Sequence, residues 1–431
     1  MITSTRNTAL LLLGSLLRLG AADYYVDGNA AGGGDGSIGT PWNAIASVSG
    51  LTTGDNLYFA RGSVVTGQLT VSWSGSASNS QSVIGAYGSG DRPIIDGSTG
   101  LYCVQMQNST RNNIRVENLH LRNPSNSCLR VRSTNSWWTG TNLLIEGSQT
   151  AHGVTLNCLH FRLLNCIVRS NGATGSDHGI YVDTTGVAED IILDGCTFAH
   201  NSGSGIKINS GNLARIAGVV IRNCLIQTNG NNGIDDYGSD GALVYNNVID
   251  GNGVVSDGWG IYMSSNAGTY HARSNTIANN TIIHGRTDYA AIHAASGSVG
   301  HAVWNNIIQA YGTAFYLDGT DASAFRASDY NDFYGGTVKW VLGGTNYTSS
   351  SSWRTGSGGD SHSITSDPLL TEYIPSGTSP AIRSGSDLSA LFTTDITGST
   401  RPAPWDIGAY ELIHPTASAG TVTVGTLTIG P

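Results

Sequence analysis

The chain of 431 residues is long enough for two or three average domains, but its composition favours a single repetitive fold. Glycine accounts for 58 residues and charged residues for only 12%, and the polar remainder is mostly Ser, Thr and Asn, which suits stacked strands and tight turns. The formal net charge of −9 argues against nucleic acid as a partner, because no basic stripe is present. We therefore expect an all-β protein.

The N-terminal segment, residues 1–22, combines Arg6 with a leucine-rich run from Ala9 to Leu17. The run is too short to span a membrane as a stable helix, so no membrane partner is expected. Arg18, which lies between this run and the small residues that follow, fits a secretory signal poorly. We predict a retained amphipathic anchor helix, with a cleaved signal as the alternative.

Residues 23–100 are expected to form an N-terminal cap and the first coils of the fold. Their glycine-rich loop carries Asp27 and Asp35, which could hold Ca²⁺, although such loops usually only turn. We assign no metal and no other cofactor.

A short strand pattern recurs through residues 101–335: CVQM at 103, CLRV at 128, GVTL at 153, GIYV at 179, GIKI at 205, GIDD at 233, GIYM at 260, AIHA at 291 and AFYL at 314. The spacings lie between 23 and 31 residues. Such a period predicts a parallel β-solenoid with about 25–28 residues per coil. Parallel crossovers are nearly always right-handed, so a right-handed solenoid is expected.

A second ladder places asparagines at one bend of successive coils: Asn118, Asn165, Asn223, Asn246, Asn279 and Asn305. Asparagine tolerates the left-handed conformation that a sharp bend needs. The position after this bend holds Cys166, Cys196 and Cys224 in three consecutive coils. Cys103 and Cys128 occupy the first position of the strand pattern, which is glycine in later coils. We predict that all six cysteines are buried free thiols.

Strand alternation sorts the side chains of the first ladder into two faces. If Ile206 and Ile208 point inward, Lys207 and Asn209 point outward. The exposed column is then predicted to contain Gln105, Arg130, Thr155, Tyr181, Lys207, Asp235, Tyr262, His293 and Tyr316. A second outward column includes Arg132, Asn157, Asp183, Asn209, Tyr237 and Asp318. Asp236 would fall at an interior position, where a lone carboxylate is costly, so a bulge or a satisfying neighbour is expected.

The repeat fades after Asp332 into Ser/Gly-rich loops, and residues 336–412 are expected to form an irregular closing segment. In the tail, residues 413–431, β-branched and small residues alternate. A free strand of this kind pairs readily with a partner, so the tail is a candidate assembly or docking segment.

Three stretches carry a resemblance to a known superfamily: YYVDGNAAGGGDGSIGTPWNAI with GDNLYFARG (24–45 and 54–62), IGAYGSGDRPIIDG (84–97), and the closing SDPLL to TDITGSTRPAPWDIGAYE (366–411). With the ladder, they resemble the right-handed parallel β-helix proteins, which include pectate and alginate lyases, polygalacturonases and phage tailspikes. The resemblance spans nearly the whole chain and implies the fold and polysaccharide as partner. It does not fix an activity, because enzymes and non-enzymes share these segments.

Two kinds of catalysis remain open on the outward face. A lyase needs a cation, a base and an acid, which Arg130 or Arg132, Lys207 and Tyr181 could supply. A hydrolase needs two carboxylates, for which Asp183 and Asp235 are candidates, although about 12 Å separates them. Sugar stacking needs no chemistry, and the candidate binding residues are Arg132, Asn209, Tyr237, Tyr262, His293 and Tyr316, with Trp259 at a turn.

The sequence leaves three hypotheses. The first is a trimeric virion spike of the tailspike type, attached to a larger assembly through its termini. It binds surface polysaccharide, either without cleaving it or with depolymerisation. The second is a secreted polysaccharide lyase or related enzyme. The third is a structural spike without activity.

Overall fold

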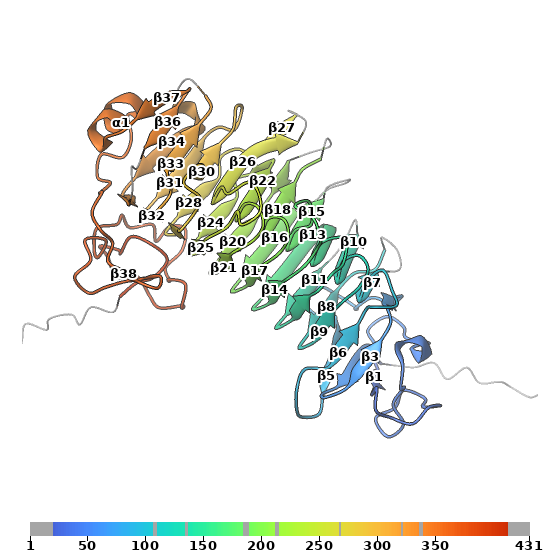
Figure 1. Cartoon of the computed structure of the whole chain (residues 1–431). Helices are drawn as coiled ribbons and strands as arrows, with labels where there is room; N and C mark the ends of the chain where they lie inside the picture. The colour runs from blue at the N-terminus through green and yellow to red at the C-terminus, as the bar shows by residue number, and fades with distance from the viewer. Residues whose placement is uncertain are drawn as a thin grey trace, which may run out of the picture.

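The computed structural model describes residues 20–412 except 107–109, 134–136, 184–188, 212–214, 267–268, 320–321 and 336–338. The predicted tail, and the predicted anchor up to residue 19, lie outside the described residues. The described chain is a right-handed parallel β-helix of about 10 turns, with the first coils and the closing segment at opposite ends (Figure 1). In the described part of the chain, no helix is long and apolar enough to cross a membrane.

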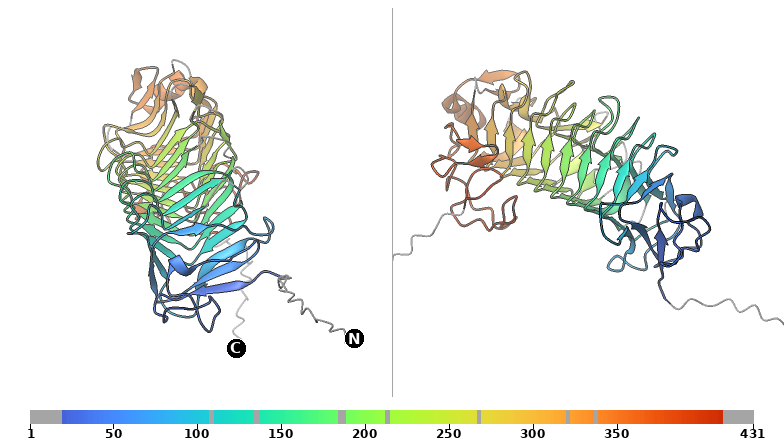
Figure 2. Two further views of the ribbon diagram at one scale, coloured as in Figure 1. Left: turned by 90° about the vertical axis from the view of Figure 1, so that its right-hand side faces the viewer. Right: turned by 60° about the horizontal axis from the view of Figure 1, so that its bottom comes forward.

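Each coil passes through three faces, and the strands of one face stack in parallel along the axis (Figure 2). The first face consists of β4 (Leu69–Val71), β7 (Val104–Met106), β10 (Leu129–Ser133), the start of β13 (Val154–Leu164), β15 (Ile180–Asp183), β18 (Ile206–Asn209), β22 (Ile234–Tyr237), β26 (Ile261–Asn266), β30 (Ala290–Ala294), β33 (Thr313–Leu317) and β36 (Trp340–Leu342).

The second face consists of β1 (Asp23–Val26), β2 (Asn56–Ala60), β5 (Ser82–Tyr87), β8 (Ile114–Glu117), β11 (Trp138–Thr141), the end of β13, β16 (Glu189–Asp194), β19 (Ile216–Ala217), β20 (Val220–Arg222), β23 (Ser239–Asp240), β24 (Leu243–Tyr245), β28 (Thr276–Ala278), β31 (His301–Trp304) and β34 (Phe325–Asp329).

The third face consists of β3 (Val64–Thr66), β6 (Ile94–Asp96), β9 (His120–Arg122), β12 (Leu144–Glu146), β14 (Ile167–Arg169), β17 (Thr197–Ala199), β21 (Leu225–Gln227), β25 (Val248–Asp250), β29 (Thr281–Ile283), β32 (Ile307–Gln309) and β35 (Asp332–Tyr334).

The remaining elements lie at turns and at the ends: η1 (Ile45–Ser47), β27 (Tyr270–His271), η2 (Ala322–Ala324), β37 (Thr345–Tyr347), α1 (Ser350–Ser357), β38 (Leu370–Thr371) and β39 (Ile374–Pro375). The Ser/Gly-rich stretch predicted as loop thus contains a helix. Ser349 caps α1 by accepting a hydrogen bond from the Ser352 amide, and Trp353 anchors the helix in the core.

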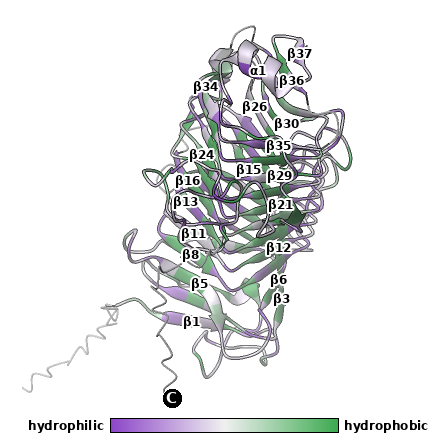
Figure 3. Cartoon of the chain, turned by 90° about the vertical axis from the view of Figure 1, so that its left-hand side faces the viewer, coloured by the Kyte–Doolittle hydropathy of each residue, from purple (hydrophilic) through white to green (hydrophobic). Residues whose placement is uncertain are grey.

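The core is a continuous apolar column inside the coils. Hydrophobic and hydrophilic residues alternate along the strands (Figure 3). The predicted inward residues Ile206 and Ile208 are 0% and 2% exposed. All six cysteines are buried, and the structure places them as free thiols.

The predicted asparagine bend is confirmed, because Asn118, Asn165, Asn223, Asn246, Asn279 and Asn305 all have φ between 50° and 59°. Two further asparagine ladders, which sequence reasoning missed, lie inside the coils. In one, the Asn280 side-chain amide donates to Asn306 Oδ1 at 3.0 Å and accepts from Asn247 at 3.0 Å. The other joins Asn171, Asn201, Asn229 and Asn252.

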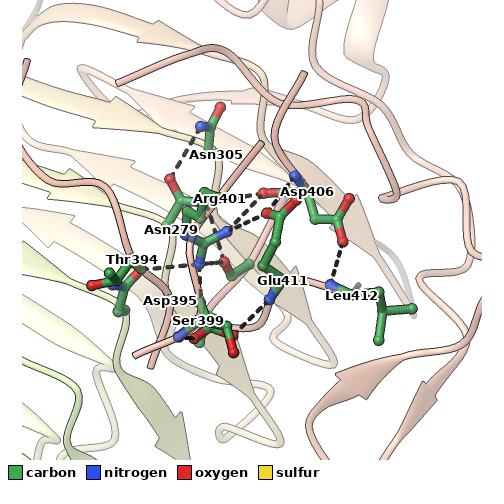
Figure 4. Close-up of polar contacts among 12 residues, drawn as sticks. Asn279, Asn305, Thr394, Asp395, Ser399, Arg401, Asp406, Glu411 and Leu412 are labelled. Carbon is green, nitrogen blue, oxygen red and sulfur yellow. Dashed lines mark hydrogen bonds and ion pairs between the residues drawn. The ribbon is translucent and has the colours of Figure 1, made fainter. Parts of the chain in front are cut away.

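The closing segment folds back over the asparagine bend of the C-terminal coils (Figure 4). The Asn279 and Asn305 side-chain amides donate to the carbonyls of Asp406 and Ser386 at 3.0 and 2.8 Å. Arg401 forms a buried ion pair with Glu411 at 3.0 Å. The bend residues of these coils are therefore bound to a segment about 100 residues later in the chain.

Candidate functional site

The predicted column of outward-facing side chains lies on the first face in the expected register. Backbone pairing places Lys207 directly between Tyr181 and Asp235. The column continues on either side through these residues: Tyr262, His293 and Tyr316, and Thr155, Arg130 and Gln105.

The expectation that the whole column is exposed is wrong at Lys207, Asp235 and His293, whose exposed fractions are 8%, 5% and 8%. These side chains lie on the outside of the sheet, but side chains from adjacent coils cover them. The Tyr237 ring lies over Lys207, and the Trp259 ring packs against His293 at 4.2 Å.

Lys207 is held by an anion and an aromatic ring at once. Its Nζ lies 3.0 Å from Asp235 Oδ2 and 3.0 Å from the centre of the Tyr237 ring. Burial lowers the pKa of Lys207, and the negative charge of Asp235 opposes that shift. The ammonium group is therefore a paired cation at the centre of the column.

Asp235 is surrounded by donors. Besides Lys207, Ser204 Oγ donates to its Oδ2 at 3.1 Å and Asn232 Nδ2 donates to its Oδ1 at 2.7 Å. Both oxygens are thus engaged, so this carboxylate positions Lys207 rather than being poised as a nucleophile.

A row of aromatic side chains follows Lys207 toward the C-terminal coils. The ring centres of Tyr237 and Tyr262 lie 5.7 Å apart, and those of Trp259 and Tyr262 lie 6.0 Å apart in a stacked arrangement. Tyr316 continues the row at 4.9 Å from His293. Burial raises the pKa of both Tyr237 and Tyr262, so their hydroxyl groups stay neutral.

His293 connects this row to a carboxylate. Its Nε2 lies 3.1 Å from Asp318 Oδ1. Burial lowers the pKa of His293, and Asp318 opposes the shift. A neutral imidazole that donates from Nε2 to Asp318 satisfies both facts.

On the other side of Lys207, Tyr181 is fixed by two histidines and an amide. Asn209 Nδ2 donates to the Tyr181 hydroxyl oxygen at 2.6 Å, and the ring centres of His152 and His178 lie 4.5 and 5.7 Å from the Tyr181 ring centre. Burial lowers the pKa of His178 well below its usual range and that of His152 to about 4. Both imidazoles are therefore neutral.

The structure brings together only part of the predicted lyase set. Tyr181 and Lys207 are neighbours, but Arg130 lies three strands from Lys207, which is on the order of 14 Å. The Arg130 guanidinium stacks over the Tyr102 ring at 4.9 Å, and Arg132 is exposed in the second column.

The register does not bring together the two candidate hydrolase carboxylates. Asp183 pairs with Asn209, which pairs with Tyr237, so Asp183 lies two strands and one column away from Asp235. The side chain of Asp183 lies outside the described residues.

Asp236 points into the core, as the alternation predicted, and β22 stays in register without a bulge. Its carboxylate accepts hydrogen bonds from the Ser239 amide at 2.9 Å, from the Ser239 hydroxyl and from Asn275 Nδ2 at 2.7 Å. Burial raises its pKa against these donors. The neighbours, rather than a bulge, satisfy this residue.

A third column, which the sequence analysis did not separate, lies just before the glycines of the ladder: His152, His178, Ser204, Asn232 and Trp259. His178 Nδ1 accepts from the Ser204 amide at 3.0 Å, and Asn232 Oδ1 accepts from the Trp259 amide at 2.9 Å. The pattern was visible in the repeat as the residue before each glycine. A Cβ at Gly205 would lie 2.7 Å from Ile226, so glycine lets the coils approach.

No group of three or more His, Cys, Asp and Glu side chains among the described residues could hold a metal ion. The two calcium candidates cap their own loop: Asp27 Oδ1 accepts from the Asn29 amide, and Asp35 Oδ1 accepts from the Ser37 amide and the Thr40 hydroxyl.

Residues 152–330 match the family model described as "Right handed beta helix region". Together with the described coils, this match shows the fold of a right-handed parallel β-helix. None of the curated proteins compared with the sequence matches it.

Two solved structures share the fold over nearly their full length. Pectate lyase Pel9A is 16% identical, with 91% of this chain and 96% of that chain covered and a TM-score of 0.58. A structure of XylC in complex with xylose is 9% identical, with 91% and 98% covered and a TM-score of 0.57. At these identities the likeness concerns the fold.

Proposed function

We propose that the first face binds a polysaccharide that lies along the axis of the β-helix. The observation that carries this proposal is the set of aromatic side chains on the outside of β15 and of β22 to β33, on either side of Lys207, in which Tyr181, Tyr262 and Tyr316 keep ring surface accessible. Strands repeat about every 4.8 Å, which roughly matches the length of one sugar residue. Successive sugar rings would therefore meet successive rings of the protein.

The likeness in fold to Pel9A and to XylC in complex with xylose supports a carbohydrate ligand by analogy alone. The paired state of Lys207 and Asp235 favours binding over cleavage, because Asp235 holds the ammonium group and both oxygens of Asp235 accept hydrogen bonds. Their role in this proposal is to hold the Tyr237 ring and the centre of the face rigid.

The test is replacement of Tyr181 and Tyr262 by alanine, separately and together. Each loss of stacking surface should weaken binding to an immobilised polysaccharide by about 1 kcal/mol. Polygalacturonate, alginate and xylan are suitable probes, measured by retention and calorimetry. Tyr334→Ala on the third face is the matched control. Unchanged binding in the double variant would contradict the proposal.

A second candidate is β-elimination on an acidic polysaccharide, favoured by the lowered pKa of Lys207 and by Tyr181 on the adjacent strand. In that reaction Lys207 would take the C5 proton and Tyr181 would protonate the leaving oxygen. Lys207→Arg should then abolish the ultraviolet absorbance of unsaturated products while binding persists. If Lys207→Arg binds as tightly as the wild type and the wild-type protein forms no unsaturated product, the elimination is contradicted and only the binding function remains.

We further propose a virion as the setting of this face, with three chains in a spike attached through residues 1–22 and 413–431. A secreted location is the alternative. The proposal is supported by the amphipathic N-terminal sequence and the alternating C-terminal sequence. An intact Met1 and a trimer mass by light scattering are expected. A mature start near Asp23 and a monomer mass would favour the secreted alternative.

A further inference from the structure

The outward column of the first face ends at β4. Thr70 pairs with Gln105, which pairs with Arg130, so β4 continues the column toward the N-terminus. Among the described residues, no strand of the first face precedes β4. The place of a further strand is taken by η1 and the loop of residues 48–53 that follows it.

This loop and β4 enclose a hollow of about 200 Å³. Residues of β4 and its flanks line it from both sides of the strand, Gln68, Thr70 and Ser72 from the outward side and Leu69 and Trp73 from the inward side, and Ile45, Val48, Ser49 and Leu51 line it from η1 and the loop. Val48 and Leu51 also pack against the core, so the loop lies beside β4 at the N-terminal end of the column. The volume is below the ~300–1,000 Å³ usual for drug-sized ligands, so it suits a single sugar ring.

The wall of the hollow is rigid. Asp55, 1% exposed, accepts from the Thr52 amide at 2.8 Å and from the Thr52 hydroxyl at 3.0 Å. Its other carboxylate oxygen accepts from the Ala22 amide at 2.7 Å, and Trp73 Nε1 donates to the Asp55 carbonyl at 3.0 Å. The C-terminal end of the loop is therefore fixed, which preorganises this wall.

The floor offers a directed polar group. Thr70 Oγ1 accepts from Gln68 Nε2 at 3.2 Å and from Gln105 Nε2 at 3.4 Å. With its lone pairs occupied in this way, the hydroxyl hydrogen is left to donate to a sugar oxygen. Val48 and Leu51 supply apolar surface for the opposite side of a sugar ring.

We infer that the protein recognises the end of a polysaccharide chain, with the terminal sugar residue in the hollow at β4 and the following residues along the first face. This inference rests on the proposed function and deepens it. A chain running along the column toward the N-terminus reaches the loop of residues 48–53, where the column ends. The end of a polysaccharide chain therefore contacts both the hollow and the first face, whereas an internal segment contacts the first face alone and binds more weakly.

The first test compares long and short fragments of polygalacturonate or xylan at equal total mass. Recognition of chain ends predicts that the amount of protein bound at saturation rises in proportion to the number of ends. Fragments capped at the reducing end or at the non-reducing end then identify the end used, because one cap should lower affinity at least tenfold. Binding that tracks polymer mass and ignores both caps would overturn the inference.

The second test fills the hollow. Thr70→Trp, and independently Ser49→Trp on the opposite wall, should weaken binding of short fragments at least tenfold. Thr66→Trp, an exposed threonine on the third face, is the matched control for the bulk of the new ring. Circular dichroism and the unfolding midpoint establish that each variant folds. If Thr70→Trp does not fold, Ser49→Trp at an exposed position still tests the inference.

These outcomes separate the inference from the proposed function. If filled variants bind as the wild type does while Tyr181→Ala and Tyr262→Ala bind weakly, the face binds glycan and the chain-end inference is wrong. If no fragment binds to the wild-type protein, the proposed function fails and the inference falls with it.

Discussion

At the scale of the residue, Lys207 shows that position in a coil and exposure are separate properties. Its place on the outward side follows from strand alternation, which makes Ile206 and Ile208 the inward residues. Its burial depends on Tyr237 and Asp235, which come from the next coil. The same lysine therefore belongs to the surface pattern and to a buried ion pair.

Lys207→Met should lower the free energy of unfolding by about 3 kcal/mol, because Asp235 would keep its buried charge with neutral donors alone. Denaturant unfolding measures this change. The double variant Lys207→Met with Asp235→Asn removes both charges and should recover a large part of the loss. A single variant as stable as the wild type would show that the ion pair contributes nothing.

Asn280 is a second residue for which the loss in free energy of unfolding on substitution can be predicted. Its side chain bonds to Asn306 and to the Val244 carbonyl, and its Oδ1 accepts from the Asn247 side chain and amide. Asn280→Ala leaves several buried groups unpaired, each costing about 1–3 kcal/mol, so a loss of at least about 3 kcal/mol is expected. Asn142→Ala, at a partly buried bend, is the comparison in thermal unfolding, and an equal loss there would refute the special role of the interior ladder.

At the scale of the element, β35 carries a carboxyl group in an unusual place. Asp332 is 0% exposed beneath the closing segment, and neither carboxylate oxygen has a hydrogen-bond partner among the described residues. Burial, reinforced by the negative charge of Asp367, raises the pKa of Asp332 to about 8. The carboxyl group is therefore protonated in the folded protein at neutral pH.

This protonation makes stability depend on pH. An unfolded aspartate titrates near pH 4, so between about pH 4 and pH 8 the folded state binds one proton more than the unfolded state. The free energy of unfolding should fall by up to about 1.4 kcal/mol per pH unit through this window and level off above it. Unfolding of Asp332→Asn, compared with the wild type from pH 5 to pH 9, should lack this slope. An identical slope in both proteins would contradict the assignment.

The elements also show how far the sequence leads. The GIKI-type ladder predicted the strands of the first face and the register of Tyr181, Lys207 and Asp235, because one short alternating pattern repeats with each coil. The helix α1 was missed, because its serine-rich sequence resembles a loop and burial of Trp353, which anchors the helix, cannot be read from that sequence. The hollow at β4 could not be predicted, since it depends on where a loop without periodicity lies beside β4.

At the scale of the whole molecule, the continuous interior column explains the cysteines. All six lie in the core, with exposed fractions of 1% or less. In the native protein they should resist a maleimide reagent, and all six should react after denaturation without reductant. Mass spectrometry counts the labels. Fewer than six labels in the denatured, unreduced protein would show disulfide bonds and contradict the prediction.

The hydrogen bonds between the closing segment and the asparagine bend also affect how the protein unfolds. In a solenoid each coil contacts only its neighbours, so coils at a free end can open one at a time. Bonds from Asn246, Asn279 and Asn305 to this segment tie three successive coils to a common strap. We therefore expect the three coils that carry Asn246, Asn279 and Asn305 to open together and the N-terminal coils to open one at a time, so that unfolding proceeds from the N-terminal end toward the C-terminal end.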